Sequence, residues 1–472
     1  MKQNIIGRAR EKAILERIFN SSKAEFVAVC GRRRVGKTFL INEYFEEDLV
    51  FQTAGLAHDN MAHQIKSFYE DLIEWSLPRQ TEAPNSWIDV FSLLRSLIKN
   101  STKRRKVIML DELPWMDTPR SGFISALEHF WNAWASNRHD IVLIVCGSAT
   151  SWMMDKLINN HGGLHNRLTY QLFLEPFTLG ESEQFLQQHG FNLSRYDMAV
   201  GYMILGGIPY YLDMLDPRLS LAQNIHELFF RPNGLLSHEF SNLYSALFKN
   251  SSNYMTVVEA LSNKKTGMNR NEIIAATSLP TGSGLTTILK NLEWCGFIRK
   301  YQNYKASRND STLYQLIDFF TLFHFRFLNG KKNRGNWNAL HGTPAFHAWA
   351  GLTFELLTLS HINQIKHKLG ISGVNSMEYA WRNLDSGQGA QIDLVIDRAD
   401  NTINLCEMKF SIGVFSIDKG YEMNLRNKLM RFMACAEKHK SIQLTMVTTY
   451  GIERNAHSGI VNNEVTLDDL FL

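Results

Sequence analysis

The fold of the N-terminal part is decided by the stretch Phe26-Val27-Ala28-Val29-Cys30-Gly31-Arg32-Arg33-Arg34-Val35-Gly36-Lys37-Thr38. Its first five residues form an apolar run typical of a buried strand, and residues 38–45 follow a helical pattern. Between them lies a complete Gly-x-x-x-x-Gly-Lys-Thr motif. In such a loop the backbone N–H groups and the helix N-terminus surround phosphates, the lysine reaches the β and γ oxygens, and the threonine hydroxyl binds Mg²⁺. We therefore expect a nucleotide site made by Gly31, Arg32, Arg33, Arg34, Val35, Gly36, Lys37 and Thr38.

A second motif follows downstream, where the apolar strand Lys106 to Leu110 ends in Asp111 and Glu112. Ligands bind at this carboxyl edge of an α/β sheet. We expect Asp111 to hold the Mg²⁺ shell, and Glu112 to polarise the attacking water because a carboxylate accepts the proton of such a water. The pattern alone also fits a strand end with two solvated acids. The phosphate-binding loop upstream favours the catalytic interpretation.

Three further features carry two interpretations each. Ser148 follows the apolar run Ile141 to Cys146 and either senses the γ-phosphate or is a turn residue. Arg167 precedes the run Tyr170 to Leu174 and either stabilises transition-state charge as an arginine finger or is an ordinary surface residue. The run Arg32 to Arg34 either adds phosphate contacts or is solvated.

Bulk composition limits the classes of protein that fit. A length of 472 residues predicts roughly three domains at about 150 residues each. The hydrophobic share of 44% and the charged share of 20% are typical of globular chains and exclude general disorder. A net charge of +4 is too weak to indicate a nucleic-acid partner from charge alone. The cysteines lack CxxC spacing, and no apolar run is long enough for a membrane span, so we expect a cytoplasmic protein with reduced thiols.

The order of patterns predicts the domain organisation. Short β-like runs alternate with helical patterns over residues 1–176, which predicts a parallel sheet covered by helices. Residues 177–235 keep apolar residues at helical spacing and predict a helical lid. Residues 236–330 predict three short helices followed by two strands, the order of a winged helix-turn-helix, and residues 331–342 predict a linker before a third domain at 343–472.

The winged-helix pattern allows two roles. Residues 281–294 would read DNA while four cations of the wing contact phosphates, namely Arg299, Lys300, Lys305 and Arg308. The predicted recognition helix, however, carries Lys290 as its single cation. The alternative is an intramolecular scaffold.

In the third domain, residues 391–397 and 403–410 predict a β-hairpin. A turn centred on Asp400 would set Asp393 opposite Glu407 and Gln391 opposite Lys409. Two acids and a lysine on one face suit metal-assisted phosphodiester hydrolysis, with Mg²⁺ bound by Asp393 and Glu407 and water oriented by Lys409. Glu355, an acid within an apolar helix, would complete this site because an unpaired buried acid is costly. A cross-strand salt bridge on an exposed face is the alternative.

Over residues 1–330 the sequence resembles archaeal-type ATPases of the STAND and AAA+ class. The resemblance is carried by the loop GRRRVGKT, the opening Ile6-Gly7-Arg8, the stretch LDELPW at residues 110–115, and Gly206-Gly207-Ile208-Pro209-Tyr210. It implies that Pro209 lies near the adenine and that the protein assembles or switches with its nucleotide. Glu355, Asp393 and Glu407-x-Lys409 resemble the PD-(D/E)XK, restriction-endonuclease-like fold, which implies a nuclease-like domain.

These patterns together predict an α/β P-loop ATPase with a helical lid, a winged helix and a C-terminal restriction-endonuclease-like domain. We expect it to bind and hydrolyse ATP with Mg²⁺ and to control a DNA nuclease-like domain in DNA processing or defence. The alternative is a nucleotide-switched regulatory or signalling protein of the STAND type, which binds DNA or a protein partner. A homo-oligomer fits either function. The residues expected to be catalytic are Lys37, Glu112, Arg167, Glu355, Asp393, Glu407 and Lys409.

Overall fold

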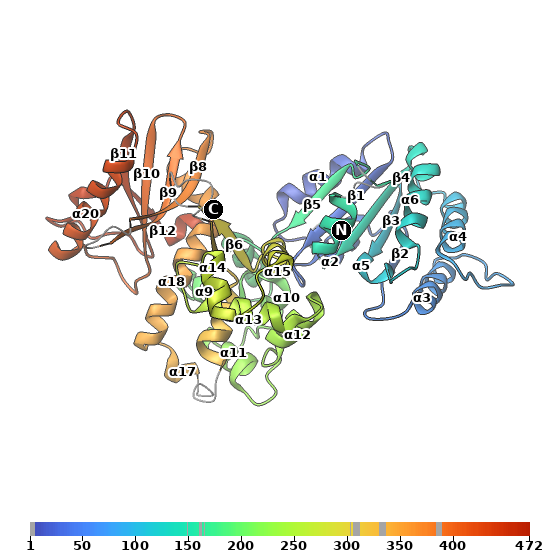
Figure 1. Cartoon of the computed structure of the whole chain (residues 1–472), viewed down its shortest axis with the longest axis horizontal. Helices are drawn as coiled ribbons and strands as arrows, with labels where there is room; N and C mark the ends of the chain where they lie inside the picture. The colour runs from blue at the N-terminus through green and yellow to red at the C-terminus, as the bar shows by residue number, and fades with distance from the viewer. Residues whose placement is uncertain are drawn as a thin grey trace. The chain divides into compact units, whose positions relative to one another are not determined.

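The computed structural model describes residues 5–148, 150–159, 163–164, 166–302, 304, 312–329, 337–383 and 389–472. The chain forms two compact units, Met1–Pro176 and Phe177–Leu472 (Figure 1). In the described part of the chain, every helix is too short or too polar to span a lipid bilayer. Lys305 and Arg308 of the predicted wing, and residues 331–336 of the predicted linker, lie outside the described residues.

The first unit contains a five-stranded sheet in the order β2-β3-β4-β1-β5. All four neighbouring pairs are parallel, which confirms the predicted parallel sheet. The three inner strands, β3, β4 and β1, are buried along their whole length. The strands are β1 Glu25–Gly31, β2 Leu49–Ala54, β3 Lys106–Asp111, β4 Ile141–Gly147 and β5 Tyr170–Leu174.

Helices cover this sheet and bury an aromatic core. Trp87 of α4 packs edge-on against Phe123 of α6, with ring centroids 4.7 Å apart, and both side chains are buried in the same apolar cluster. Burial of each such ring stabilises the fold by roughly 1.5–3 kcal/mol. The core therefore fixes the strands that carry the site. The helices are α1 Ala9–Phe19, α2 Lys37–Phe45, α3 Met61–Glu74, α4 Trp87–Asn100, α5 Leu113–Met116, α6 Phe123–Ala133 and α7 Thr150–Met153.

The second unit begins with the helices that the apolar spacing predicts. Gly206, at the end of α9, has a φ of +72°, which ends that helix in the left-handed conformation that glycine adopts without strain. The helices are α8 Leu179–Gln188, α9 Arg195–Leu205, α10 Pro209–Leu212, α11 Leu221–Ile225 and α12 Glu239–Leu247, with a π-helical turn at His226–Phe230.

Three helices and an antiparallel strand pair follow in the order expected of a winged helix. These are α13 Ser251–Ser262, α14 Arg270–Thr277, α15 Ser283–Trp294, β6 Ile298–Tyr301 and β7 Leu313–Leu316. We call residues 251–316 the helix–hairpin segment. The chain continues through α16 Phe319–Phe323, a π-helical turn at His324–Leu328 and α17 Trp337–Leu340.

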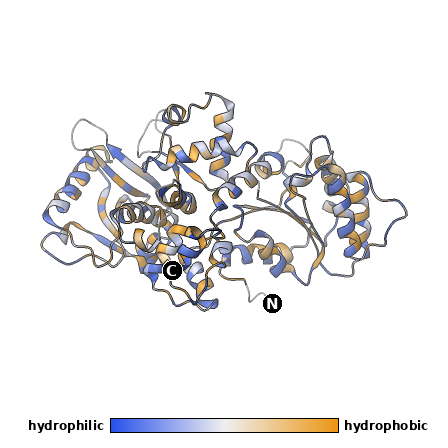
Figure 2. Cartoon of the chain, turned by 90° about the horizontal axis from the view of Figure 1, so that it is seen from below, coloured by the Kyte–Doolittle hydropathy of each residue, from blue (hydrophilic) through white to orange (hydrophobic). Residues whose placement is uncertain are grey.

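The C-terminal sheet has the order β12-β11-β10-β9-β8. Its strands β8, β9 and β10 are antiparallel neighbours, whereas β10, β11 and β12 are parallel. Hydrophobic and hydrophilic residues are mixed along these strands (Figure 2). The elements are α18 Pro344–Ser360, α19 Ile362–Lys368, β8 Ser376–Asn383, β9 Ala390–Arg398, β10 Thr402–Lys409, α20 Lys419–Cys435, β11 Ser441–Thr448 and β12 Asn463–Thr466.

The predicted hairpin is confirmed, because Ile403 pairs with Asp397 and Cys406 pairs with Leu394. The predicted apolar face of β9 is wrong in part. The register with β8 shifts between the pairs Tyr379–Val395 and Trp381–Ile392, and across this step β9 has one residue more than β8. Ile392 and Val395 consequently belong to the same apolar core. The strict alternation that placed Ile392 with Leu394 and Ile396 does not hold there.

The helix–hairpin segment is anchored on this sheet through Tyr304. The Tyr304 ring lies in the core of the sheet, with its centroid 5.1 Å from that of Phe432 and 5.5 Å from that of Tyr379. Its backbone N–H donates to the carbonyl of Ala380 on β8 over 2.9 Å. Tyr304 is therefore an integral part of the core of the C-terminal sheet.

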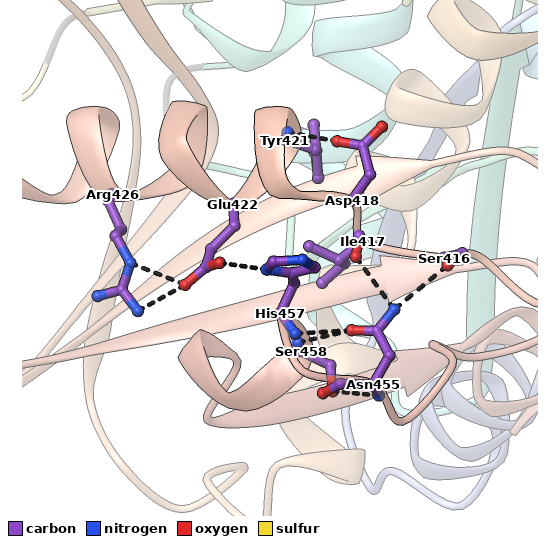
Figure 3. Close-up of polar contacts among 9 residues, drawn as sticks. All are labelled: Ser416, Ile417, Asp418, Tyr421, Glu422, Arg426, Asn455, His457 and Ser458. Atoms are coloured by element: carbon purple, nitrogen blue, oxygen red, sulfur yellow. Dashed lines mark hydrogen bonds and ion pairs between the residues drawn. The ribbon is translucent and has the colours of Figure 1, made fainter.

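A polar network fixes the start of α20 (Figure 3). The His457 ring forms a hydrogen bond of 2.6 Å with Glu422, which also accepts from Arg426 over 2.6 Å. Asn455 donates to the carbonyl of Ile417 over 3.0 Å. The network holds the start of α20 and the residues just before it against residues 455–457, and α20 carries two side chains, Tyr421 and Lys428, that contact Glu407 of β10.

Candidate functional site

Both glycines of the phosphate-binding loop are required by the backbone. Gly31 ends β1, and a β-carbon there would lie 2.4 Å from the carbonyl oxygen of Leu174 on β5. Gly36 precedes α2 with a φ of +88°, a conformation that side chains disfavour. The first glycine allows two strands to approach, and the second turns the chain into the helix.

Lys37 is buried under the loop, with 6% of its surface exposed. Its Nζ donates to the carbonyls of Gly31 and Arg32, each over 3.0 Å. Burial lowers the pKa of Lys37, and the nearby carboxylates of Glu112 and Asp111 oppose that shift. The ammonium group is thus fixed between the loop and the two acids.

Thr38 and Asp111 meet directly. The Thr38 Oγ1 donates to Asp111 Oδ2 over 2.5 Å, and Asp111 Oδ1 accepts from the backbone N–H of Glu112 over 2.8 Å. A hydroxyl and a carboxylate side by side are the hard oxygen donors that Mg²⁺ prefers. The residues present therefore fit a magnesium ion.

Glu112 is oriented by the next strand of the sheet. Its Oε2 accepts from Ser148 twice, from the hydroxyl over 2.9 Å and from the backbone N–H over 3.3 Å. Glu112 has a φ of +44°, which costs a residue other than glycine strain energy. The structure thus brings five predicted side chains together, namely Lys37, Thr38, Asp111, Glu112 and Ser148.

The described hydrogen bonds and ion pairs do not join the other predicted side chains to this group. The Arg167 side chain is exposed, and it makes no hydrogen bond or ion pair with the site residues among those that the structure describes. Pro209 begins α10 in the second unit, so its predicted place near the adenine stays a prediction. Arg33 and Arg34 are half-buried, and Arg34 has a φ of +74°.

Sequence reasoning missed the side chain of Arg8 as part of this site. Arg8 is buried, and its guanidinium donates to the carbonyl of Glu175 over 2.7 Å and to that of Val35 over 3.2 Å. It therefore ties the phosphate-binding loop to the end of β5. The signal in the sequence was a cation one glycine after the apolar pair Ile5-Ile6.

A second group of charged side chains lies on the C-terminal sheet, and we call Glu355, Asp393, Glu407 and Lys409 the acidic cluster. The charge of Asp393 raises the pKa of both Glu355 and Glu407, and Lys409 lowers both. The four predicted residues are therefore close enough to act on one another. The described residues include no group of three or more His, Cys, Asp or Glu side chains arranged to hold a metal ion.

Glu407 is held by helix α20. Only 2% of its side chain is exposed, and Lys428 donates to its Oε1 over 2.5 Å. The Tyr421 hydroxyl donates to Oε2 over 3.4 Å, and Lys409 lies over the Tyr421 ring, 5.1 Å from its centroid. Burial is the main cause that raises the pKa of Glu407. The sequence did not predict Lys428 or Tyr421 as part of this group.

Glu355 is held from the opposite side by Lys265 of the helix–hairpin segment. Burial first, and then Asp393, raise the pKa of Glu355 to about 7. A cavity of about 20 Å³, with room for roughly one water molecule, borders Glu355, Asp393 and Arg299. Arg299 donates to Gln315 over 2.7 Å, so it faces this interior and not a nucleic-acid surface as the wing interpretation expected.

Comparison with known proteins identifies the N-terminal part. The family described as "ATPase domain predominantly from Archaea" matches residues 6–215. An uncharacterized protein of Methanocaldococcus jannaschii is 25% identical over 328 residues, 68% of each chain. An uncharacterized ATP-binding protein of the same organism is 46% identical over 41 residues, 9% of this chain and 70% of that protein.

Among solved structures, a Walker-type ATPase of Pyrococcus abyssi matches with a TM-score of 0.51 at 18% identity. The match covers 69% of this chain and 97% of that one, and at this identity it shows the fold alone. The loop, the parallel sheet and the family match agree. Residues 6–215 of this chain thus match the ATPase domain found predominantly in Archaea, and their parallel sheet agrees with that match.

Proposed function

We propose that this protein hydrolyses ATP to ADP and phosphate at the site made by Lys37, Thr38, Asp111 and Glu112. The observation that carries the proposal is the direct contact of Thr38 with Asp111 beside the buried Lys37. Thr38 and Asp111 would hold Mg²⁺, which when bound offsets charge on the phosphate oxygens. Lys37 would place its charge on the β and γ oxygens, since its Nζ is already fixed at the loop.

The position of Glu112 supports a role in activating the attacking water. It follows β3 at the carboxyl edge of the sheet, and two hydrogen bonds from Ser148 limit its rotation. A positioned carboxylate of this kind contributes roughly 10²–10⁴-fold to a rate. Ser148 is therefore a positioning residue for Glu112.

The test compares three variants in ATP binding and ATP turnover. Lys37→Ala should lose nucleotide binding. Glu112→Gln should bind ATP while turnover falls by roughly 10²–10⁴-fold, because the amide no longer accepts the proton. Glu47→Gln, an exposed acid after α2, is the matched control and should behave as the wild type. Unchanged turnover in Glu112→Gln would contradict the assignment.

We infer a second candidate function, hydrolysis of DNA phosphodiester bonds at the acidic cluster. Three observations support it: the buried Glu407 and the partly buried Glu355 with raised pKa values, the neighbouring Asp393, and Lys409 within reach of their charges. As placed, the acids among the described residues do not converge on a metal position. The rival is a nucleotide-switched regulatory protein whose C-terminal sheet is not catalytic.

Cleavage of plasmid DNA with Mg²⁺ or Mn²⁺ separates the two functions. The wild type should cleave, whereas Asp393→Ala and Lys409→Ala should not. Asp400→Ala is the matched control, because Asp400 is an exposed acid in the turn of the same hairpin. Equal inactivity of all four proteins would favour the regulatory function.

A further inference from the structure

Glu407, which is buried, and Glu355, which is partly buried, are each held by a lysine that the β9–β10 hairpin does not supply. Lys428 of α20 holds Glu407, and Lys265, in the loop between α13 and α14, holds Glu355. The two pairs differ in exposure. The side chain of Lys265 is 45% exposed and that of Glu355 is 16% exposed. The Lys265 ammonium group can therefore move into water while the carboxylate stays in place.

The backbone beside Lys265 is clamped from two sides. Gln315 of β7 donates to the carbonyl of Lys265 over 2.7 Å. The next carbonyl, that of Thr266, accepts from the Tyr301 hydroxyl over 2.6 Å and from Arg382 of β8 over 2.7 Å. Together with Tyr304, which is anchored in the core of the sheet, these contacts keep the helix–hairpin segment over Glu355.

We propose that the helix–hairpin segment is a latch on the acidic cluster, in which Lys265 occupies the carboxylate of Glu355 and a divalent cation enters only when that ammonium group leaves. The inference rests on the second candidate function. It explains why no three acids converge among the described residues, since two of them face ammonium groups instead of a shared position. Hard divalent cations and ammonium groups compete for the same carboxylate oxygens.

Binding of Mn²⁺ to the nucleotide-free, full-length protein tests the latch, with free Mn²⁺ followed by its electron paramagnetic resonance signal. The assay is run at about pH 8.5, because the pKa of Glu355 is raised to about 7 and protons would otherwise compete. Lys265→Gln removes the competing charge and should bind Mn²⁺ roughly tenfold more tightly. Lys265→Arg keeps the charge and should match the wild type.

Two controls assign the result. Lys264→Gln is the matched variant, because the neighbouring Lys264 pairs with Glu272 over 2.6 Å and does not touch the cluster, and it should leave Mn²⁺ affinity unchanged. Asp393→Asn should abolish the site. Suppose that Asp393→Asn removes the Mn²⁺ site but Lys265→Gln binds Mn²⁺ with the same affinity as the wild type. That result would overturn the latch and leave the second candidate function standing. Absence of any Asp393-dependent site in both proteins would overturn both.

Discussion

Replacing Lys428 by methionine measures how the buried carboxylate of Glu407 is stabilised. Glu407 is 2% exposed, and methionine keeps much of the lysine stem while removing the charge. The carboxylate must then stay ionised without its partner or take up a proton. Protonation at pH 7.5, from an ordinary pKa of about 4.3 in the unfolded chain, costs about 4 kcal/mol. This value is an upper limit on the free energy of unfolding that the variant loses.

Removing one partner of a buried pair costs about 3–5 kcal/mol, and the 20% exposure of Lys428 reduces that figure. We expect Lys428→Met to lower the free energy of unfolding of the second unit by roughly 2–4 kcal/mol at pH 7.5. The sign of the pH dependence follows from the raised pKa of Glu407, because the folded state binds more protons than the unfolded state above pH 4. The variant therefore loses stability as the pH rises. At pH 5 the upper limit on its loss of unfolding free energy falls to about 1 kcal/mol.

Hydrogen exchange of the amides in β10 and α20 provides the measurement, at pH 5.0 and at pH 7.5. Lys419→Met, an exposed lysine on the same helix, is the matched control and should change protection little at either pH. The reasoning fails if Lys428→Met costs the same free energy at both pH values. That result would assign the loss to packing and not to the charge of Glu407.

Three other substitutions have defined outcomes. Gly31→Ala brings a β-carbon to 2.4 Å from the Leu174 carbonyl oxygen, so it should lower the melting temperature and abolish binding of a fluorescent ATP analogue. Retained affinity for the analogue would argue against the close approach of the two strands. Thr38→Ala should raise the Mg²⁺ concentration for half-maximal ATP turnover at least roughly tenfold, whereas Thr38→Ser should not, and identical titrations would remove Thr38 as a ligand. Tyr304→Ala should destabilise β8 and β9 by roughly 3–5 kcal/mol in hydrogen exchange, with Tyr304→Phe as control; full protection in the alanine variant would refute the anchor.

Local patterns predicted the elements of the first unit well. Five apolar runs each became a strand, because a parallel sheet covered on both faces needs nearly continuous hydrophobic residues. These runs are residues 26–30, 49–53, 106–110, 141–146 and 170–174. The pairing of Thr38 with Asp111 followed from the rule that ligands bind at the carboxyl edge of the strands. The order β2-β3-β4-β1-β5 was not predicted, since it depends on which strands meet across long stretches of chain.

The hairpin register was predictable for the four pairs nearest the turn, from Ile403–Asp397 to Cys406–Leu394, because a tight turn fixes the pairs that follow it directly. The partners of its acids were not. Lys265 lies 90 residues before Glu355, and no sequence period links the two. The bulge in β9 between Ile392 and Val395 also left no signal, because it inserts one residue into otherwise ordinary strand sequence. Long-range packing decided these features, and local patterns do not report it.

The insertion of Tyr304 between Phe432 and Tyr379 has an evolutionary consequence. Recombination that replaced only the helix–hairpin segment or only the C-terminal sheet would break this packing. The sheet would keep an unfilled space in its core, and the segment would expose the Tyr304 ring. Substitutions at Tyr304 and Phe432 should therefore be inherited together among relatives of this chain. The helix–hairpin segment and the C-terminal sheet would then pass through lineages as one heritable block.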